Sequence, residues 1–193
     1  MRLFVALDID AEIRERIARF LDGVREFAPD VRWARPEALH LTLKFIGEMD
    51  AARLEAVRGA LAQVQGEATE IGFRETGFFP TAKSARVFWV GVKADARLAA
   101  LARAVEDALE PLGVEGEQRA SSPHLTLART GSGRPSRGRE DRANPSFKRL
   151  QEKLAAMPAP DFGAMTAREF SLYQSKLSPA GAQYTKLAGF ALR

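Results

Sequence analysis

An internal repeat limits the fold of this chain more than any other property of its sequence. When the sequence is moved 84 positions along itself, His40-Leu-Thr-Leu43 falls on His124-Leu-Thr-Leu127 without a gap. The same shift places the largely apolar residues 2–7 over residues 86–91. The 193-residue chain therefore reads as two related halves.

Each half follows the order strand, helix, strand. Residues 11–27 and 95–111 carry apolar side chains three and four positions apart, which predicts one amphipathic helix in each half. A second helix in each half is expected at 51–65 and at 145–156, and further strands at 69–79, 167–173 and 182–192.

This pattern predicts an α+β protein with two pseudo-symmetric lobes in a single bilobal domain, residues 1–193. Repeat one covers about 1–83 and repeat two about 84–193, with a basic loop inserted at about 130–144. We expect each lobe to be a small sheet with helices on its outer face. The uncovered faces then line a cleft between the lobes, which is the natural position for a site.

The only two histidines of the chain both begin a His-Leu-Thr-Leu segment. Residues i and i+2 of a strand share a face, so His40 and Thr42 lie side by side, whereas Leu41 points into the core. The same spacing applies to His124 and Thr126. Two lobes related by a two-fold axis would present two imidazoles and two hydroxyls to one cleft.

This set of groups is suited to acid–base chemistry at a phosphodiester. One imidazole can deprotonate the attacking water or hydroxyl while the other protonates the oxygen that leaves, and threonine hydroxyls can bind the phosphate oxygens. A single histidine on a strand is more often structural, but a matched pair with identical neighbours favours catalysis. Each motif has Thr where a metal site would need His or Glu, so we expect no metal.

Charge and composition restrict the possible partners and the compartment. Residues 129–149 contain seven basic and two acidic side chains, which leaves 22 basic and 23 acidic residues elsewhere. This segment can be a solvated loop, a contact for the phosphates of RNA, or both.

The chain has no cysteine and no apolar stretch long enough to span a membrane, and we expect a cytoplasmic monomer. The aromatic residues Trp33, Phe78, Phe79 and Tyr184 could stack a terminal base, but aromatic residues in such positions more often belong to the core, and none is assigned to the site.

The opening RLFVALDI, the HLTLKFIGE of the first half and the PHLTLAR of the second half resemble the two-histidine phosphoesterase superfamily. The similarity extends over essentially the full chain and is strongest to the LigT-like RNA 2',3'-cyclic phosphodiesterases, formerly called 2'-5' RNA ligases. It implies hydrolysis of terminal 2',3'-cyclic phosphates on RNA, or on cyclic nucleotides, to 2'-phosphomonoesters. It also implies that no metal or cofactor takes part.

The resemblance assigns His40 as proton donor and His124 as proton acceptor, an order that the two nearly symmetric motifs do not supply by themselves. It makes Thr42, Thr126 and Arg129 ligands of the phosphate. Arg129 is five residues from His124 and would face the wrong side of an ideal strand, so the strand must end or bulge near Ala128.

By the same alternation, Lys44 shares the face of His40 and is a second candidate cation, although a solvent-facing lysine is an equally good reading. Two other functions stay open at this point. One is 2'-5' RNA ligation by the reverse reaction, and the other is non-catalytic binding of RNA or nucleotide phosphates. A protein that only binds phosphates needs cations more than it needs titratable imidazoles. The two histidines therefore disfavour non-catalytic binding.

Overall fold

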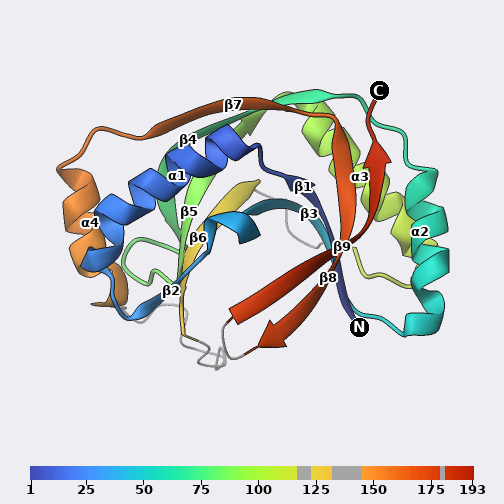
Figure 1. The fold of residues 1–193 in the computed structure, drawn as a ribbon, viewed down its shortest axis with the longest axis horizontal. Coiled ribbons are helices and arrows are strands. Elements are labelled where there is room, and N and C mark those ends of the chain that lie inside the picture. Colours follow the sequence, from blue (N-terminus) through green and yellow to red (C-terminus); the bar gives the residue numbers. More distant parts are fainter. Residues whose placement is uncertain (117–122, 132–144, 179–180) are drawn as a thin grey trace.

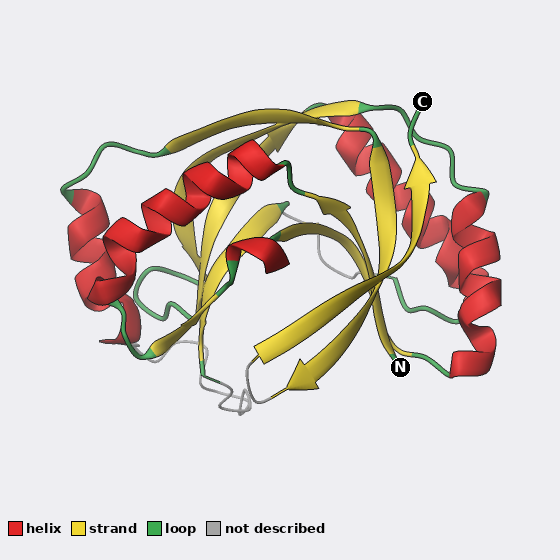
Figure 2. Cartoon of the chain, viewed as in Figure 1, coloured by secondary structure: helices red, strands yellow, loops and turns green. Residues whose placement is uncertain are grey.

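Two antiparallel sheets form the centre of the molecule, and the helices lie outside them in the computed structural model (Figures 1 and 2). The structure describes residues 1–193 except 117–122, 132–144 and 179–180. Its strands are β1 (Arg2–Asp8), β2 (Val31–Trp33), β3 (His40–Glu48), β4 (Thr69–Phe79), β5 (Val87–Ala94), β6 (His124–Thr130), β7 (Asp161–Ala167), β8 (Glu169–Ser178) and β9 (Gly181–Ala191). Its helices are α1 (Ala11–Val24), α2 (Leu54–Ala62), α3 (Ala96–Leu109) and α4 (Lys148–Ala155).

Each sheet takes strands from both halves of the sequence. The four-stranded sheet has the order β3-β1-β8-β9, and the five-stranded sheet has the order β2-β6-β5-β4-β7. β3, which begins with His40, is therefore an edge strand of one sheet, and β6, which begins with His124, lies inside the other. The predicted α+β fold, with two sheets and helices outside them, is confirmed.

The first helix of each half crosses to the sheet that holds the other half's histidine. α1 packs on β7 of the five-stranded sheet through its buried residues Ile13, Ile17, Leu21 and Val24. α3 packs on β3 of the four-stranded sheet, and its first turn is capped by the Asp95 carboxylate, which accepts a hydrogen bond from the amide of Arg97 at 2.9 Å. The two lobes therefore do not coincide with the two sequence halves.

The helices lie within the residue ranges expected from apolar periodicity, but two strands do not appear in that expectation. β2 is only three residues long, and β7 contains Gly163 and two alanines in place of β-branched residues, so neither produces a clear strand pattern. The predicted basic loop at about 130–144 lies, beyond Gly131, outside the described residues.

Matching bulges interrupt the two histidine strands. The pairing of β3 with β1 passes from Thr42 directly to Lys44, and the pairing of β6 with β5 passes from Thr126 directly to Ala128. The unpaired residues are Leu43 and Leu127, which are 84 positions apart. Each bulge shifts the alternation of side chains by one residue, so the residues after it change faces.

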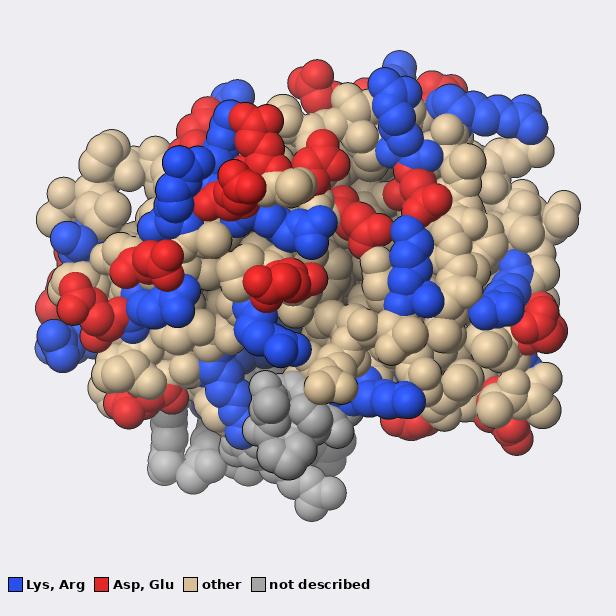
Figure 3. Space-filling view, viewed as in Figure 1, with Lys and Arg blue, Asp and Glu red and all other residues tan. Residues whose placement is uncertain are grey.

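The described surface carries charges of both signs. On the face in Figure 3, Lys and Arg side chains are interspersed with Asp and Glu side chains. This agrees with the nearly balanced charge of the chain outside residues 129–149. Among the described residues, no helix has both the length and the apolar character needed to cross a membrane.

Candidate active site

His40 lies at the start of β3 with its ring held from two sides. Its Nδ1 is 2.8 Å from the carbonyl oxygen of Ala38, which can only accept, so this nitrogen carries a proton and leaves Nε2 for a ligand. The ring centroid is 4.8 Å from that of Phe4 and 4.9 Å from that of Tyr184. Burial lowers the pKa of His40, while the Ala38 carbonyl and the nearby Asp8 oppose this effect.

The second motif places His124, Thr126 and Arg129 on one face of β6. Arg129 donates from Nη2 to Oγ1 of Thr126 over 3.3 Å, although the two residues are three positions apart in a strand. The bulge at Leu127 makes this contact possible. The prediction that β6 bulges near Ala128 is therefore confirmed. The His124 ring lies edge-on to Phe79, with centroids 5.0 Å apart.

The two motifs come together between the sheets. β3 and β6 have Cα atoms within 8 Å of each other although they belong to different sheets. The Arg129 guanidinium also contributes to lowering the pKa of His40, so the cation of the second motif acts on the imidazole of the first. Thr42 follows two residues after His40, ahead of the bulge, and shares its face.

Lys44 does not share that face. The bulge at Leu43 turns Lys44 to the helix side of the sheet, where its side chain is 2% exposed. Its Nζ lies 2.8 Å from Oε1 of Glu106 in α3 and 2.8 Å from the carbonyl oxygen of Glu115. Strict alternation gave the wrong face for this residue, and Lys44 is a buried link between β3 and α3.

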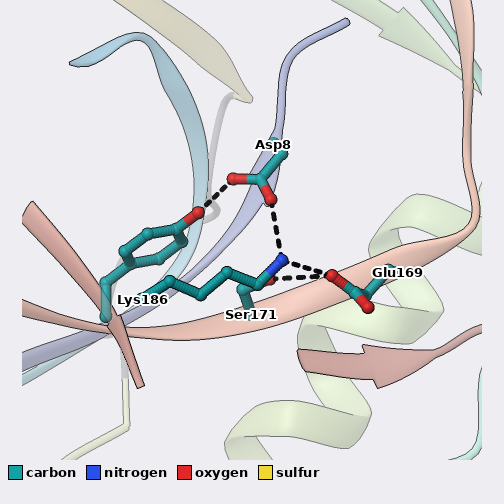
Figure 4. A network of polar contacts seen from close by, with 5 residues as sticks. Asp8, Glu169, Ser171 and Lys186 are labelled. Atoms are coloured by element: carbon teal, nitrogen blue, oxygen red, sulfur yellow. Dashed lines mark hydrogen bonds and ion pairs between the residues drawn. The ribbon is translucent and has the colours of Figure 1, made fainter. Parts of the chain in front are cut away.

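A polar network that includes Asp8, Glu169 and Lys186 lies on the four-stranded sheet (Figure 4). Asp8 is paired directly opposite His40 in the β1–β3 ladder. Its carboxylate accepts a hydrogen bond from the hydroxyl of Tyr173 and lies 3.1 Å from Nζ of Lys186, which also pairs with Glu169. Burial and the bond to Asp8 raise the pKa of Tyr173, and the bond to Glu169 raises the pKa of Lys186. Asp8 therefore accepts hydrogen bonds from two donors, Tyr173 and Lys186.

The equivalent position beside His124 has no side chain. Gly91 pairs with His124 as Asp8 pairs with His40, so β1 and β5 correspond with an offset of 83 while β3 and β6 keep 84. A Cβ on Gly91 would lie 2.7 Å from the carbonyl oxygen of Arg74, which leaves no room for a carboxylate. The two histidines thus stand in different electrostatic surroundings despite their identical motifs.

Comparison with known proteins agrees with this arrangement. The family model described as LigT like Phosphoesterase matches the chain twice, over residues 7–89 and 90–184. The chain belongs to this family. As a LigT-like phosphoesterase, it is 35% identical to an RNA 2',3'-cyclic phosphodiesterase of Archaeoglobus fulgidus, over 98% of this chain and 99% of that protein. It is 31% identical to the protein of the same name from Methanothermobacter thermautotrophicus, over 100% of this chain and 99% of the relative.

Solved structures have the same fold. The structure of Escherichia coli LigT complexed with 3'-AMP matches with a TM-score of 0.76 and 28% identity, over 99% of this chain and 97% of that one. A structure from Thermus thermophilus matches with a TM-score of 0.77 and 29% identity, over 100% and 98% of the two chains.

Sequence reasoning did not find Asp8, Tyr173 or Lys186. Asp8 ends a strand and has no acidic counterpart in the second half, which was the one available signal. Tyr173 lies in β8 and Lys186 in β9, and neither strand carries a motif. These two residues reach Asp8 only because the fold brings their strands into the same sheet as β1. Within the part of the chain that the structure describes, no three His, Asp or Glu side chains gather in a position to hold a metal ion.

Proposed function

We propose that this LigT-like phosphoesterase hydrolyses terminal 2',3'-cyclic phosphates of RNA to 2'-phosphomonoesters. The observation that carries the proposal is the meeting of the two motifs, in which Arg129 of the second acts on His40 of the first. Full-length relatives from two archaea bear the name of this activity. The match to a structure described as a complex with 3'-AMP agrees with a site for a nucleoside phosphate.

We assign His40 as the proton donor. The Ala38 carbonyl and the Asp8 carboxylate both favour its protonated form, and Gly91, the residue paired with His124, has no carboxylate to correspond to that of Asp8. Burial lowers the pKa of His40 at the same time, which makes the imidazolium a stronger acid toward a departing oxygen. His124, without a facing carboxylate, is then the proton acceptor for water.

The reaction follows from these roles. His124 takes a proton from water as the water oxygen forms a bond to phosphorus, and His40 gives a proton to the 3' oxygen as the bond from phosphorus to that oxygen breaks. Thr42 and Thr126 donate hydrogen bonds to the non-bridging phosphate oxygens, and Arg129 balances the negative charge that develops on them. The 2' oxygen keeps its bond to phosphorus, so the product is a 2'-phosphomonoester.

The test is a short oligonucleotide with a 2',3'-cyclic phosphate end. We expect conversion to a 2'-phosphate end, unchanged by chelators, and a loss of about 10²- to 10⁴-fold in kcat for His40→Ala and for His124→Ala. Thermal unfolding of each variant checks that the fold is retained. Full activity of His124→Ala, or a 3'-phosphate product, would reject the proposal, and joining to an added 5'-hydroxyl RNA would favour ligation.

We also propose that the protein acts as a monomer in the cytoplasm. All the groups assigned to the reaction come from one chain, so a second copy is not needed to complete the site. Light scattering on the purified protein should give a mass near the 21.2 kDa of one chain. A dimer mass would reject the proposed monomer, and fractionation of cells would test the compartment.

A further inference from the structure

A second arginine is paired directly with Arg129 across the five-stranded sheet. In the β2–β6 ladder, Arg32 lies opposite Arg129 and Trp33 lies opposite Ala128. Directly paired residues of neighbouring strands project from the same face of a sheet. Arg32 is exposed, whereas Trp33 packs against the buried Phe88 on the other face. The site face of this sheet therefore carries two neighbouring arginines.

This pairing is unfavourable as long as no anion binds. Like charges directly opposite each other destabilise a sheet. Among the described residues, no ion pair includes either arginine. Arg129 donates to the neutral hydroxyl of Thr126, and its ladder partner on the side away from Arg32 is the apolar Val87. Two such cations are suited to a ligand with two anionic groups.

We propose that Arg32 binds the phosphodiester on the 5' side of the terminal nucleotide while Arg129 binds the cyclic phosphate, an inference that rests on the proposed function. Both phosphates belong to one nucleotide, because the first is on the 5' oxygen and the second is on the 2' and 3' oxygens of the same ribose. Directly paired residues have Cβ atoms about 4.5–5.5 Å apart, and the long arginine side chains can extend from there to two separate phosphates.

The place of Arg32 in the fold fits this role. β2 is an edge strand of the five-stranded sheet, so an RNA chain that passes Arg32 leaves the site at the edge of the sheet. The amide of Ala34, just after β2, donates to the carbonyl oxygen of Leu127 at the bulge of the second motif over 2.7 Å. Backbone hydrogen bonds thus fix β2 beside Arg129. The contact makes an RNA end a better substrate than a cyclic mononucleotide, which lacks a 5' phosphodiester.

The test compares two substrates that differ in one charge. Both are adenosine 2',3'-cyclic phosphate with a group on the 5' oxygen, which is a methyl phosphodiester in one and an uncharged methylphosphonate ester in the other. We expect the native protein to have a KM about tenfold lower for the charged substrate, the range of one charge-assisted hydrogen bond. Arg32→Gln should remove most of this preference through KM, and thermal unfolding checks that the fold is retained.

Two further variants separate the contact from a general effect of charge. Arg32→Lys keeps the charge and should retain part of the preference. Arg19→Gln removes the same charge from an exposed residue of α1 and should retain all of it. Equal KM values of the native protein for the two substrates would overturn the 5' contact and leave the proposed function intact. So would a native preference in Arg32→Gln, whatever the change in overall rate.

A binding measurement covers the case in which neither substrate is turned over. Calorimetry then compares adenosine 2',5'-bisphosphate with adenosine 2'-phosphate. Tighter binding of the bisphosphate, lost in Arg32→Gln and retained in Arg19→Gln, would support the contact and reject only the proposed reaction. Equal binding of the two compounds, or tighter binding that persists in Arg32→Gln, would reject the contact as well.

Discussion

Two imidazoles in identical motifs would be equivalent if their surroundings were equivalent, and Asp8 makes the surroundings different. Asp8 lies opposite His40 and is held by Tyr173 and Lys186, whereas Gly91 lies opposite His124. A carboxylate near an imidazole favours the imidazolium. In the proposed mechanism, the order of proton donor and acceptor therefore depends on residues outside the two motifs.

We expect Asp8→Asn to reduce kcat/KM severalfold at alkaline pH and to leave it nearly unchanged at acidic pH. Burial lowers the pKa of His40 and Asp8 opposes this, so loss of the carboxylate lowers the pKa further. On the alkaline side of the profile, the rate follows the small protonated fraction of His40, which then decreases. On the acidic side, His40 is protonated in either protein. The measurement is kcat/KM against pH with a cyclic nucleotide.

Glu169→Gln is the control for this prediction. It breaks the other ion pair of Lys186, but Glu169 is not among the groups that act on the pKa of His40. Its profile should keep the native shape. If His40 were the proton acceptor, Asp8→Asn would instead raise the rate at acidic pH and leave the alkaline side unchanged, so the experiment also decides the order.

Arg129→Ala should lower kcat/KM by about 10²-fold, because in the proposed mechanism the guanidinium, which contacts Thr126, binds the phosphate and stabilises charge in the transition state. Arg129→Lys keeps the charge but loses the planar fork, and we expect it to recover only part of the loss. Steady-state kinetics with a cyclic phosphate end measures both variants. Native kinetics for Arg129→Ala would show that Arg129 does not contact the substrate in the reaction.

At the scale of elements, the two bulges explain why strand alternation succeeded for some residues and failed for others. It placed His40 and Thr42 correctly because they lie ahead of the bulge at Leu43. A bulge near Ala128 was inferred only because Arg129 was expected to bind the phosphate, which regular alternation would not allow. No residue type marks either bulge, since Leu43 and Leu127 are ordinary strand residues. Applying the second bulge to the first half would have turned Lys44 away from the site and Phe45 toward it.

The duplicated motif, the amphipathic helices and the α+β class could be predicted from the sequence because each leaves a local pattern. The one-residue difference between β1 and β5 could not, since apolar strands align equally well at offsets of 83 and 84. The network of Asp8, Tyr173 and Lys186 joins residues about 165 and 178 positions apart, and no local pattern reports such a contact.

Lys44→Ala should destabilise the protein by about 1–3 kcal/mol, because it removes a buried partner of Glu106 and of the Glu115 carbonyl. Turnover by the folded protein should stay close to native, since Lys44 lies on the helix side of the sheet. Urea unfolding and kinetics measure the two effects. The exposed Lys93 provides the control, as Lys93→Ala should change neither. A large loss of activity in a variant of native stability would contradict this prediction and show that Lys44 takes part in the reaction.

For the whole molecule, we propose that the crossing of helices makes the two lobes one folding unit. α1 belongs to the first half of the sequence but packs on the five-stranded sheet, and α3 belongs to the second half but packs on the four-stranded sheet. The four-stranded sheet itself pairs β1 with β8 from the far end of the chain. Neither sheet can form completely while the other half is unfolded, which favours a single cooperative transition.

Leu172→Ala tests this coupling, because Leu172 is fully buried in β8 of the four-stranded sheet while both tryptophans lie in the five-stranded sheet. Loss of the buried side chain should cost about 2–5 kcal/mol. If the lobes unfold together, urea midpoints from tryptophan fluorescence and from far-ultraviolet circular dichroism fall by the same amount. Separate lobes would leave the fluorescence midpoint at its native value, because Trp33 and Trp89 would report a sheet that the substitution does not touch.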